Sequence, residues 1–179
     1  VGLVGSEMCI RDSYFNSGNP AKDFNPAGPQ HAQVAGCAGV LDYFDELHRH
    51  HFGASDKSSN TRLDEIHKLI LQHENELAAP ILDFIQHRAD LRLLGKTHTR
   101  DNDRAPTIAF RPLKQSAAEL TRKLQDAGIG TEHGNFYAHR LISDLGIDPE
   151  DGVIRLSLVH YGNLDEVERI LRALDSALG

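Results

Sequence analysis

One arginine near the C-terminus stands in a pattern that could bind a carboxylate. The alternation from Val153 to Val159 predicts a β-strand with Ile154, Leu156 and Leu158 on one face and Arg155 on the other. Arg155 is then a lone cation among apolar residues. A buried guanidinium requires an anionic partner, and its planar fork suits a carboxylate. The strand leaves two interpretations open, a structural ion pair with a nearby Asp or Glu, or a site for the carboxylate of a ligand.

The chain is also rich in histidine, which raises the question of a metal site. His48, His50 and His51 lie in a predicted helix, and His67 and His73 follow further on. Spacings of two and one residues spread these side chains around a helix instead of gathering them on one face. No H-E-x-x-H arrangement occurs. We therefore expect solvated surface histidines and no bound metal.

The composition argues against several classes of function. The 26 acidic and 19 basic residues are mixed along the 179-residue chain and give a net charge of −7, which disfavours a nucleic-acid partner. No apolar run approaches the roughly 20 residues of a membrane span. Cys37 is the only cysteine after the first thirteen residues, so neither a disulfide framework nor a thiolate metal site is expected. These features predict a cytoplasmic protein.

The first thirteen residues, VGLVGSEMCIRDS, differ in character from the rest. They resemble read-through of a sequencing adapter fused in frame at about Tyr14. As a targeting peptide they are poor, because Glu7 interrupts the only apolar patch and no basic segment precedes it. We expect residues 1–13 to be unstructured and foreign to the fold, and the natural chain to begin further upstream.

Two helical stretches separated by a polar linker follow. After a loop rich in Asn, Gly and Pro, apolar residues recur at helical spacing from about Gln30 to Phe52. The polar segment Gly53–Asn60 is typical of a domain boundary. A second helix should begin at the capping pair Thr61 and Asp64, and Pro80 should kink or split it.

Short strands alternate with helices in the remainder of the chain. Four strands are expected, over Leu91–Lys96, over Thr107–Arg111, before the motif GNFYA and around Arg155. Two of the intervening helices carry capping boxes at their starts, Ser116 with Glu119 and Asn163 with Glu166. This alternation predicts an α+β fold in which the helices cover one face of the sheet.

Three motifs resemble those of a known enzyme family. They are NPAGPQHAQVAGCAGVLDYF, GNFYA, and R-x-S-x-x-H-Y with Asn163 two residues on. From about Tyr14 to Leu178 the chain resembles class V aminotransferase-fold enzymes, which depend on pyridoxal phosphate, and within them the cysteine desulfurase-like group. The resemblance implies a C-terminal fragment of an α/β pyridoxal-phosphate transferase of fold type I. Residues 14–56 would end the large cofactor-binding domain, and residues 57–179 would form the small domain with a short, mainly antiparallel sheet.

The resemblance also assigns roles to residues. In the family, the arginine of the R-x-S strand holds the α-carboxylate of the amino-acid substrate, and here that arginine is Arg155. Many members place a Gly-Thr pair at the start of the first helix to reach the cofactor phosphate. This chain reads Ala-Gly-Pro there, so the threonine is missing. The backbone amides near Gly28 and Gln30 remain as the candidate phosphate contacts.

Two groups that the family's chemistry requires are not recognisable. Desulfurases use a loop cysteine, and aligning Gly134 and Ala138 with that loop places Tyr137 where the cysteine would stand. Tyr137 could offer a phenol to the substrate or could simply be packed. Pyridoxal phosphate also needs a lysine for its Schiff base, and no lysine lies in a strand followed by the expected Ser/His-rich turn. No catalytic residue is therefore assigned.

Two hypotheses of different class follow. The first is that the chain is the C-terminal part of a homodimeric pyridoxal-phosphate enzyme that acts on an amino acid by transamination, lyase or racemase chemistry. The lysine would then lie upstream, and the chain alone would be inactive. The second is a stand-alone, non-catalytic α+β binding or interaction module in which Arg155 forms a structural ion pair.

Overall fold

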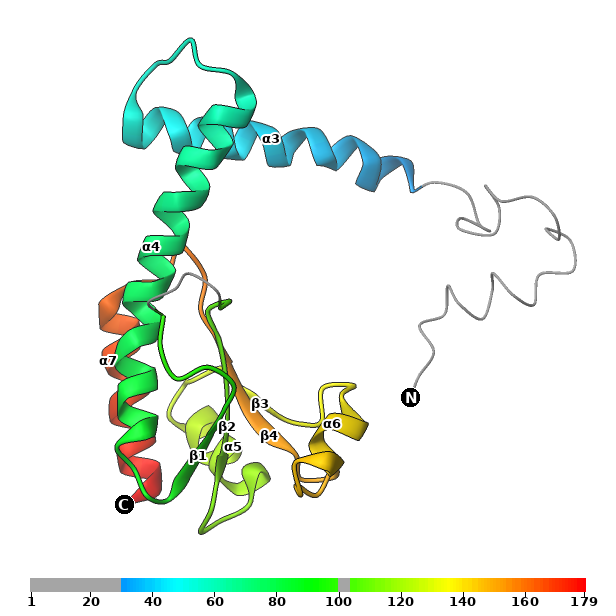
Figure 1. Ribbon diagram of the computed structural model, residues 1–179, viewed down its shortest axis with the longest axis vertical. Coiled ribbons are helices and arrows are strands. Elements are labelled where there is room, and N and C mark those ends of the chain that lie inside the picture. The colour runs from blue at the N-terminus through cyan, green and yellow to red at the C-terminus, as the bar shows by residue number, and fades with distance from the viewer. Residues whose placement is uncertain (1–29, 100–103) are drawn as a thin grey trace, which may run out of the picture. The chain divides into compact units, whose positions relative to one another are not determined.

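The computed structural model describes residues 30–99 and 104–179 (Figure 1). The chain divides into two compact units between His67 and Lys68. The domain boundary expected near residue 57, and the assignment of residues 14–56 to a large domain, stay predictions. The expectations for residues 1–13 and for Gly28 lie outside the described residues.

The described part of the first unit consists of α3 (His31–Phe52) and the start of α4 (Ser59–Gln86). The predicted span of α3 is confirmed to within one residue. Its apolar side chains are largely open to solvent, with Val34 at 61 % and Leu41 at 63 % exposure. The apolar spacing in the sequence therefore predicted the helix correctly. Within the described residues, however, no other element buries the apolar side chains of this helix.

The expectation of solvated histidines was wrong for His48. This residue is only 1 % exposed, and its Nε2 lies 2.9 Å from Oε2 of Glu65. The Nζ of Lys57 donates to the other oxygen of the same carboxylate. The hydrogen bonds from Lys57 and His48 hold the pKa of Glu65 below its usual value. The spacing of the histidines could not show that one of them turns toward a carboxylate on the next helix.

Helix α4 differs from its prediction at its start, and it is not split at Pro80. It begins at Ser59, and Oγ of Ser58 accepts the amide of Thr61 at 3.3 Å, so Ser58 takes the capping role expected of Thr61. The helix also runs unbroken through Pro80. A proline removes one backbone hydrogen bond, but the neighbouring Ala78 and Ile81 are fully buried, and their packing holds the helix together.

Four antiparallel strands form the sheet of the second unit, in the order β1-β2-β4-β3. They are β1 (Leu91–Leu94), β2 (Thr107–Pro112), β3 (Glu132–Gly134) and β4 (Val153–Ser157). The predicted α+β class and the antiparallel sheet are confirmed. The alternation predicted for the strand of Arg155 is also confirmed, since Ile154 and Leu156 are buried and Arg155 and Ser157 are exposed.

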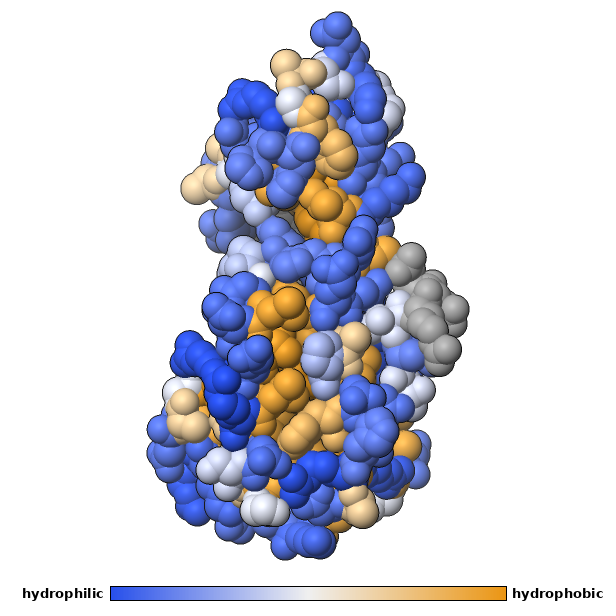
Figure 2. Space-filling view, turned by 90° about the vertical axis from the view of Figure 1, so that its left-hand side faces the viewer, coloured by the Kyte–Doolittle hydropathy of each residue, from blue (hydrophilic) through white to orange (hydrophobic). Residues whose placement is uncertain are grey.

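The main core lies on the face of the sheet that carries Ile108, Phe110 and Ile154, all at 0 % exposure. Helices α4, α5 (Ala117–Asp126) and α7 (Leu164–Leu178) contribute most of the remaining residues of this cluster (Figure 1). Burying each large apolar side chain contributes about 2 kcal/mol. Figure 2 shows that some apolar side chains of this unit still reach the surface on the side of α4 and α7.

A second, smaller cluster lies on the opposite face. Helix α6 (His139–Asp144) places Ile142 there, together with Ile147 and with Val153 of β4. The prediction that helices cover only one face was therefore wrong. Val153 makes this end of the second face apolar, and burying it against α6 removes apolar surface from water. Arg155, two residues further along β4, is left exposed.

Side-chain caps hold the ends of the helices around the sheet. Oγ of Ser116 accepts the amide of Glu119 at 3.0 Å, and Asn163 with Glu166 forms a complete capping box. Both predicted starts are confirmed. Asp151 adds a second cap, since its carboxylate oxygens accept the first two amides of α5 at 3.1 and 3.2 Å. None of the helices within residues 30–99 and 104–179 is long and apolar enough to cross a membrane.

Candidate active site

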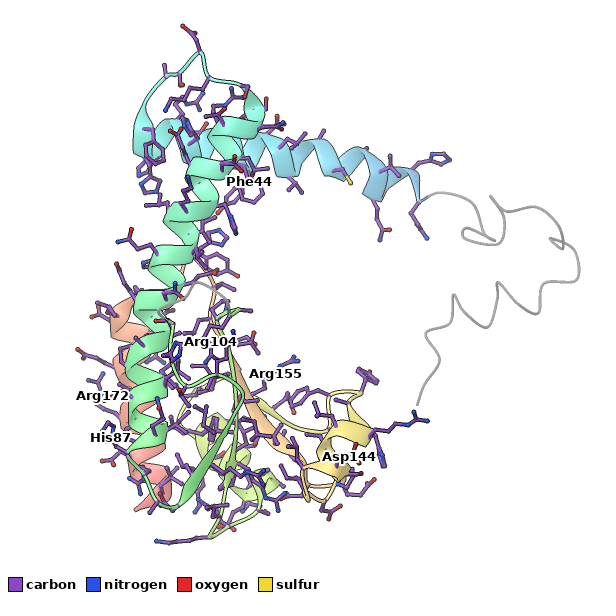
Figure 3. All side chains as sticks on the ribbon, viewed as in Figure 1. Phe44, His87, Arg104, Asp144, Arg155 and Arg172 are labelled. Carbon is purple, nitrogen blue, oxygen red and sulfur yellow. The ribbon has the colours of Figure 1, made fainter. Side chains whose placement is uncertain are left out.

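Arg155 lies in the middle of β4, and its side chain leaves the sheet on the side opposite α7 (Figure 3). Its register partners are Ala109 on β2 and Glu132 on β3. The side chain is exposed, so the prediction of a buried guanidinium was wrong. The α6 cluster covers this face at Val153 and does not bury Arg155.

The guanidinium of Arg155 lies over an aromatic ring. Its central carbon is 4.2 Å from the ring centroid of Phe136, well within cation–π range. Among the described residues, no ion pair or hydrogen bond engages this guanidinium, even though Glu132 stands directly across from it. The structural ion pair that the sequence left open is therefore not formed in the described part of the chain.

Other arginines around this face are engaged in the structure. Arg111 lies 3.6 Å from the carboxylate of Asp151, which caps α5. Arg92 donates to the carbonyl of Leu145 at 3.2 Å. Arg104 donates to backbone carbonyls, including that of Thr107 at 2.9 Å. Arg155 differs from these three because its donors remain available to a ligand.

Phe136 is held over Arg155 by an unusual turn. Phe136 and Tyr137 both have positive φ, at 47° and 64°. The amide of Ala138 donates to the carbonyl of Asn135 at 2.8 Å and closes a β-turn of the type in which both central residues are left-handed. The Asn135 side chain accepts the Tyr137 amide at 3.0 Å and donates to the Pro149 carbonyl at 3.2 Å. Bulky residues rarely adopt this conformation.

Tyr137 projects from the turn into solvent, with 95 % of the residue exposed. Of the two interpretations open for this tyrosine, the packed one is therefore wrong. Tyr137 directly follows Phe136, the residue whose ring lies under the Arg155 guanidinium. Its correspondence to the desulfurase cysteine stays a prediction.

The described residues supply only part of a site for pyridoxal phosphate. Gln30 lies at the N-cap of α3, where its side chain makes no capping hydrogen bond, and Gly28 lies outside the described residues. Lys57 and Lys123 are engaged in ion pairs with Glu65 and Glu119. Within the described ranges no group of His, Cys, Asp and Glu could hold a metal ion. The arrangement fits a carboxylate and does not form a complete cofactor site.

Sequence reasoning identified Arg155 but missed the residue beneath it. Phe136 lies within the GNFYA motif, but it carries no charge and no catalytic group, so its chemistry did not mark it as part of a site. The one local signal was Asn135, whose side chain commonly stabilises tight turns. Even that signal indicates a turn and not a contact with a strand about twenty residues away.

Comparisons with known proteins agree with this fold. The family model for aminotransferase class-V matches residues 3–170. An aminotransferase-like protein of Gibberella zeae, FGM3, is 34 % identical over 113 residues, which cover 61 % of this chain and 27 % of that protein. A probable cysteine desulfurase of Pseudomonas putida is 28 % identical over 176 residues, which cover 97 % of this chain and 37 % of the relative. The chain thus spans well under half the length of both relatives.

Among solved structures, the cysteine desulfurase CsdA of Escherichia coli shares the fold with a TM-score of 0.59 at 21 % identity. The likeness covers 84 % of this chain and 31 % of that structure. The family match begins at residue 3 and so includes most of the segment expected to be foreign to the fold. That expectation stays a prediction.

Proposed function

This chain belongs to the aminotransferase class-V family, and we propose that its Arg155 binds the α-carboxylate of an amino-acid substrate in a pyridoxal-phosphate-dependent enzyme. Enzymes of this family use pyridoxal phosphate. One observation carries the proposal. The guanidinium of Arg155 rests on Phe136 and makes no hydrogen bond or ion pair within the described residues, so its planar fork is available to a carboxylate.

In this proposal, Arg155 binds and orients the substrate and does not itself make or break bonds. Two parallel N–H···O bonds to a carboxylate fix both its position and its rotation. The substrate therefore loses translational and rotational freedom before the reaction begins. Pyridoxal phosphate supplies the electron sink when it is bound. The described residues do not complete its site.

The proposed reaction class rests on Tyr137 and on its proposed correspondence to the desulfurase cysteine. A sulfur-accepting group must be a thiolate, and a phenol in the same place cannot take that role. We therefore propose transamination, lyase or racemase chemistry and not sulfur removal. The complete protein is proposed to be a homodimer, as is common in the family, with its Schiff-base lysine outside this chain. The 179-residue chain alone should then be inactive.

The experiment uses the enzyme expressed from its full reading frame and loaded with pyridoxal phosphate. Arg155→Ala should raise the KM for the amino-acid substrate at least roughly 10-fold, since a hydrogen bond to a charged group contributes about 1.5–3 kcal/mol. Arg155→Lys should recover little, because an ammonium cannot bind a carboxylate through two parallel bonds.

The matched control is Arg92→Ala, which removes a cation from the same face of the sheet. Arg92 donates to the carbonyl of Leu145, its single hydrogen-bond partner within residues 30–99 and 104–179, and its loss should leave KM within twofold of the wild type. If Arg155→Ala keeps its KM and melts at a lower temperature, the proposal fails. That result would favour the non-catalytic module instead.

A further inference from the structure

We infer that Phe136 is a positioning residue that keeps Arg155 available to the substrate carboxylate and separate from Glu132. The inference rests on the proposed function and extends it to a residue that does not itself bind the substrate carboxylate. Arg155 and Glu132 are paired across β3 and β4, so the arginine has an acidic neighbour within its own sheet. The two side chains nevertheless form no ion pair in the described part of the chain.

The aromatic ring provides a binding surface for the guanidinium that does not consume its donors. The central carbon of the guanidinium lies 4.2 Å from the ring centroid of Phe136. A guanidinium stacked on a ring keeps its N–H groups at the edge, where a carboxylate can reach them. A neutral ring also leaves the positive charge uncompensated, whereas Glu132 would neutralise it and compete with the substrate.

The ring itself is also held by apolar contacts. Phe136 is half-buried and packs against the α6 cluster of Ile142, Ile147 and Val153. A free arginine side chain carries about 2 kcal/mol of rotamer entropy. A ring anchored in an apolar cluster removes part of that freedom before the substrate binds, which is the usual benefit of preorganisation.

The backbone conformation of the turn supports the same inference. Two successive aromatic residues with positive φ cost of order 1–3 kcal/mol each. Both hydrogen bonds of the Asn135 side chain hold this turn in place. Strain of this kind persists where the surrounding structure enforces it, and here it places an aromatic ring over a cation that has no ion-pair or hydrogen-bond partner among the described residues.

The test is an NMR titration of the enzyme expressed from its full reading frame and kept free of pyridoxal phosphate, in which the Nε–Hε group of Arg155 is observed. The probe is L-alanine, and L-alaninamide, which lacks the carboxylate, is the matched control ligand. In the wild type, the Arg155 resonance should carry a ring-current shift and should move further with L-alanine but not with L-alaninamide. Phe136→Leu should abolish the ring-current shift and weaken L-alanine binding at least fivefold, whereas Phe136→Tyr should retain both.

The possible failures are distinguishable. A wild-type Arg155 resonance that does not respond to L-alanine overturns the proposed function. A response in Phe136→Leu with wild-type affinity overturns only the positioning role. If Phe136→Leu does not fold, Glu132→Gln tests the same point. Because the ring already separates the two charges, this variant should bind L-alanine within twofold of the wild type, and a gain above fivefold would contradict the inference.

Discussion

A Cβ atom on Gly152 would lie 2.1 Å from the carbonyl carbon of Gly134, so the backbones of these two glycines are in direct contact. Gly134 ends β3, and Gly152 immediately precedes β4. This close approach lets the turn that begins at Asn135 leave β3 beside the start of β4. The ring of Phe136 then reaches the guanidinium of Arg155.

Gly152→Ala should therefore destabilise the protein and disturb the turn. Gly146→Ala is a matched control, because both glycines have positive φ, at 65° and 72°, but nothing lies within 4 Å of a Cβ at Gly146. The control should lose about 1–2 kcal/mol from backbone strain alone. Gly152→Ala should lose at least about 1 kcal/mol more, as is usual for steric overpacking. Urea denaturation of both variants measures the difference, and equal losses would contradict the contact.

Acid should weaken the second unit through Asp90. Arg88 donates to both oxygens of this carboxylate at 2.9 Å and holds the pKa of Asp90 below its usual value. A carboxylate with a lowered pKa stabilises the fold fully above its unfolded pKa of about 3.9, and this contribution is lost as the pH falls through the lower folded-state pKa. The free energy of unfolding should therefore decrease below about pH 4.

Asp90→Asn tests this assignment. The variant should be about 2 kcal/mol less stable at pH 7, because it loses charge-assisted hydrogen bonds. Between pH 5 and pH 2.5, its free energy of unfolding should fall by no more than about 1 kcal/mol, which is less than the decrease expected for the wild type. Asp144→Asn is the control, since Asp144 is exposed on α6 (Figure 3) and should change neither quantity. An acid dependence that is the same in Asp90→Asn and the wild type would show that another group is responsible.

The complete enzyme should lack cysteine desulfurase activity. Tyr137 is 95 % exposed on the turn beside Arg155, and a phenol cannot carry a persulfide. The assay is sulfide release from L-cysteine, with free pyridoxal phosphate as the baseline. Release well above that baseline would contradict the proposed reaction class. In that event Tyr137→Phe would show whether the activity depends on this position.

The sequence predicted the features that depend on nearby residues. The alternation around Arg155 and the caps at Ser116 and Asn163 are local patterns, and all three are confirmed. The exposure of Arg155 was missed because it depends on where α6 stops covering the sheet, and α6 lies about a dozen residues away in the chain. Local alternation shows which face a residue occupies but not what covers that face.

Other differences have the same origin in tertiary contacts. His48 is buried because it packs against α4 and hydrogen-bonds Glu65 of that helix. The spacing between the histidines in the sequence cannot show this contact. Helix α4 passes through Pro80 because packing compensates for the missing hydrogen bond. For the left-handed pair at Phe136 and Tyr137, the sequence offers only the preceding Asn135 as a signal, since neither residue is the glycine that normally marks such a turn.

The most direct test of the account is a crystal structure of the complete enzyme with an amino-acid substrate or a non-reactive carboxylate analogue. The account predicts the ligand carboxylate on the guanidinium of Arg155, with two N···O distances of about 2.7–2.9 Å and with the Phe136 ring still beneath the guanidinium. A carboxylate bound elsewhere, with Arg155 paired to Glu132, would contradict it.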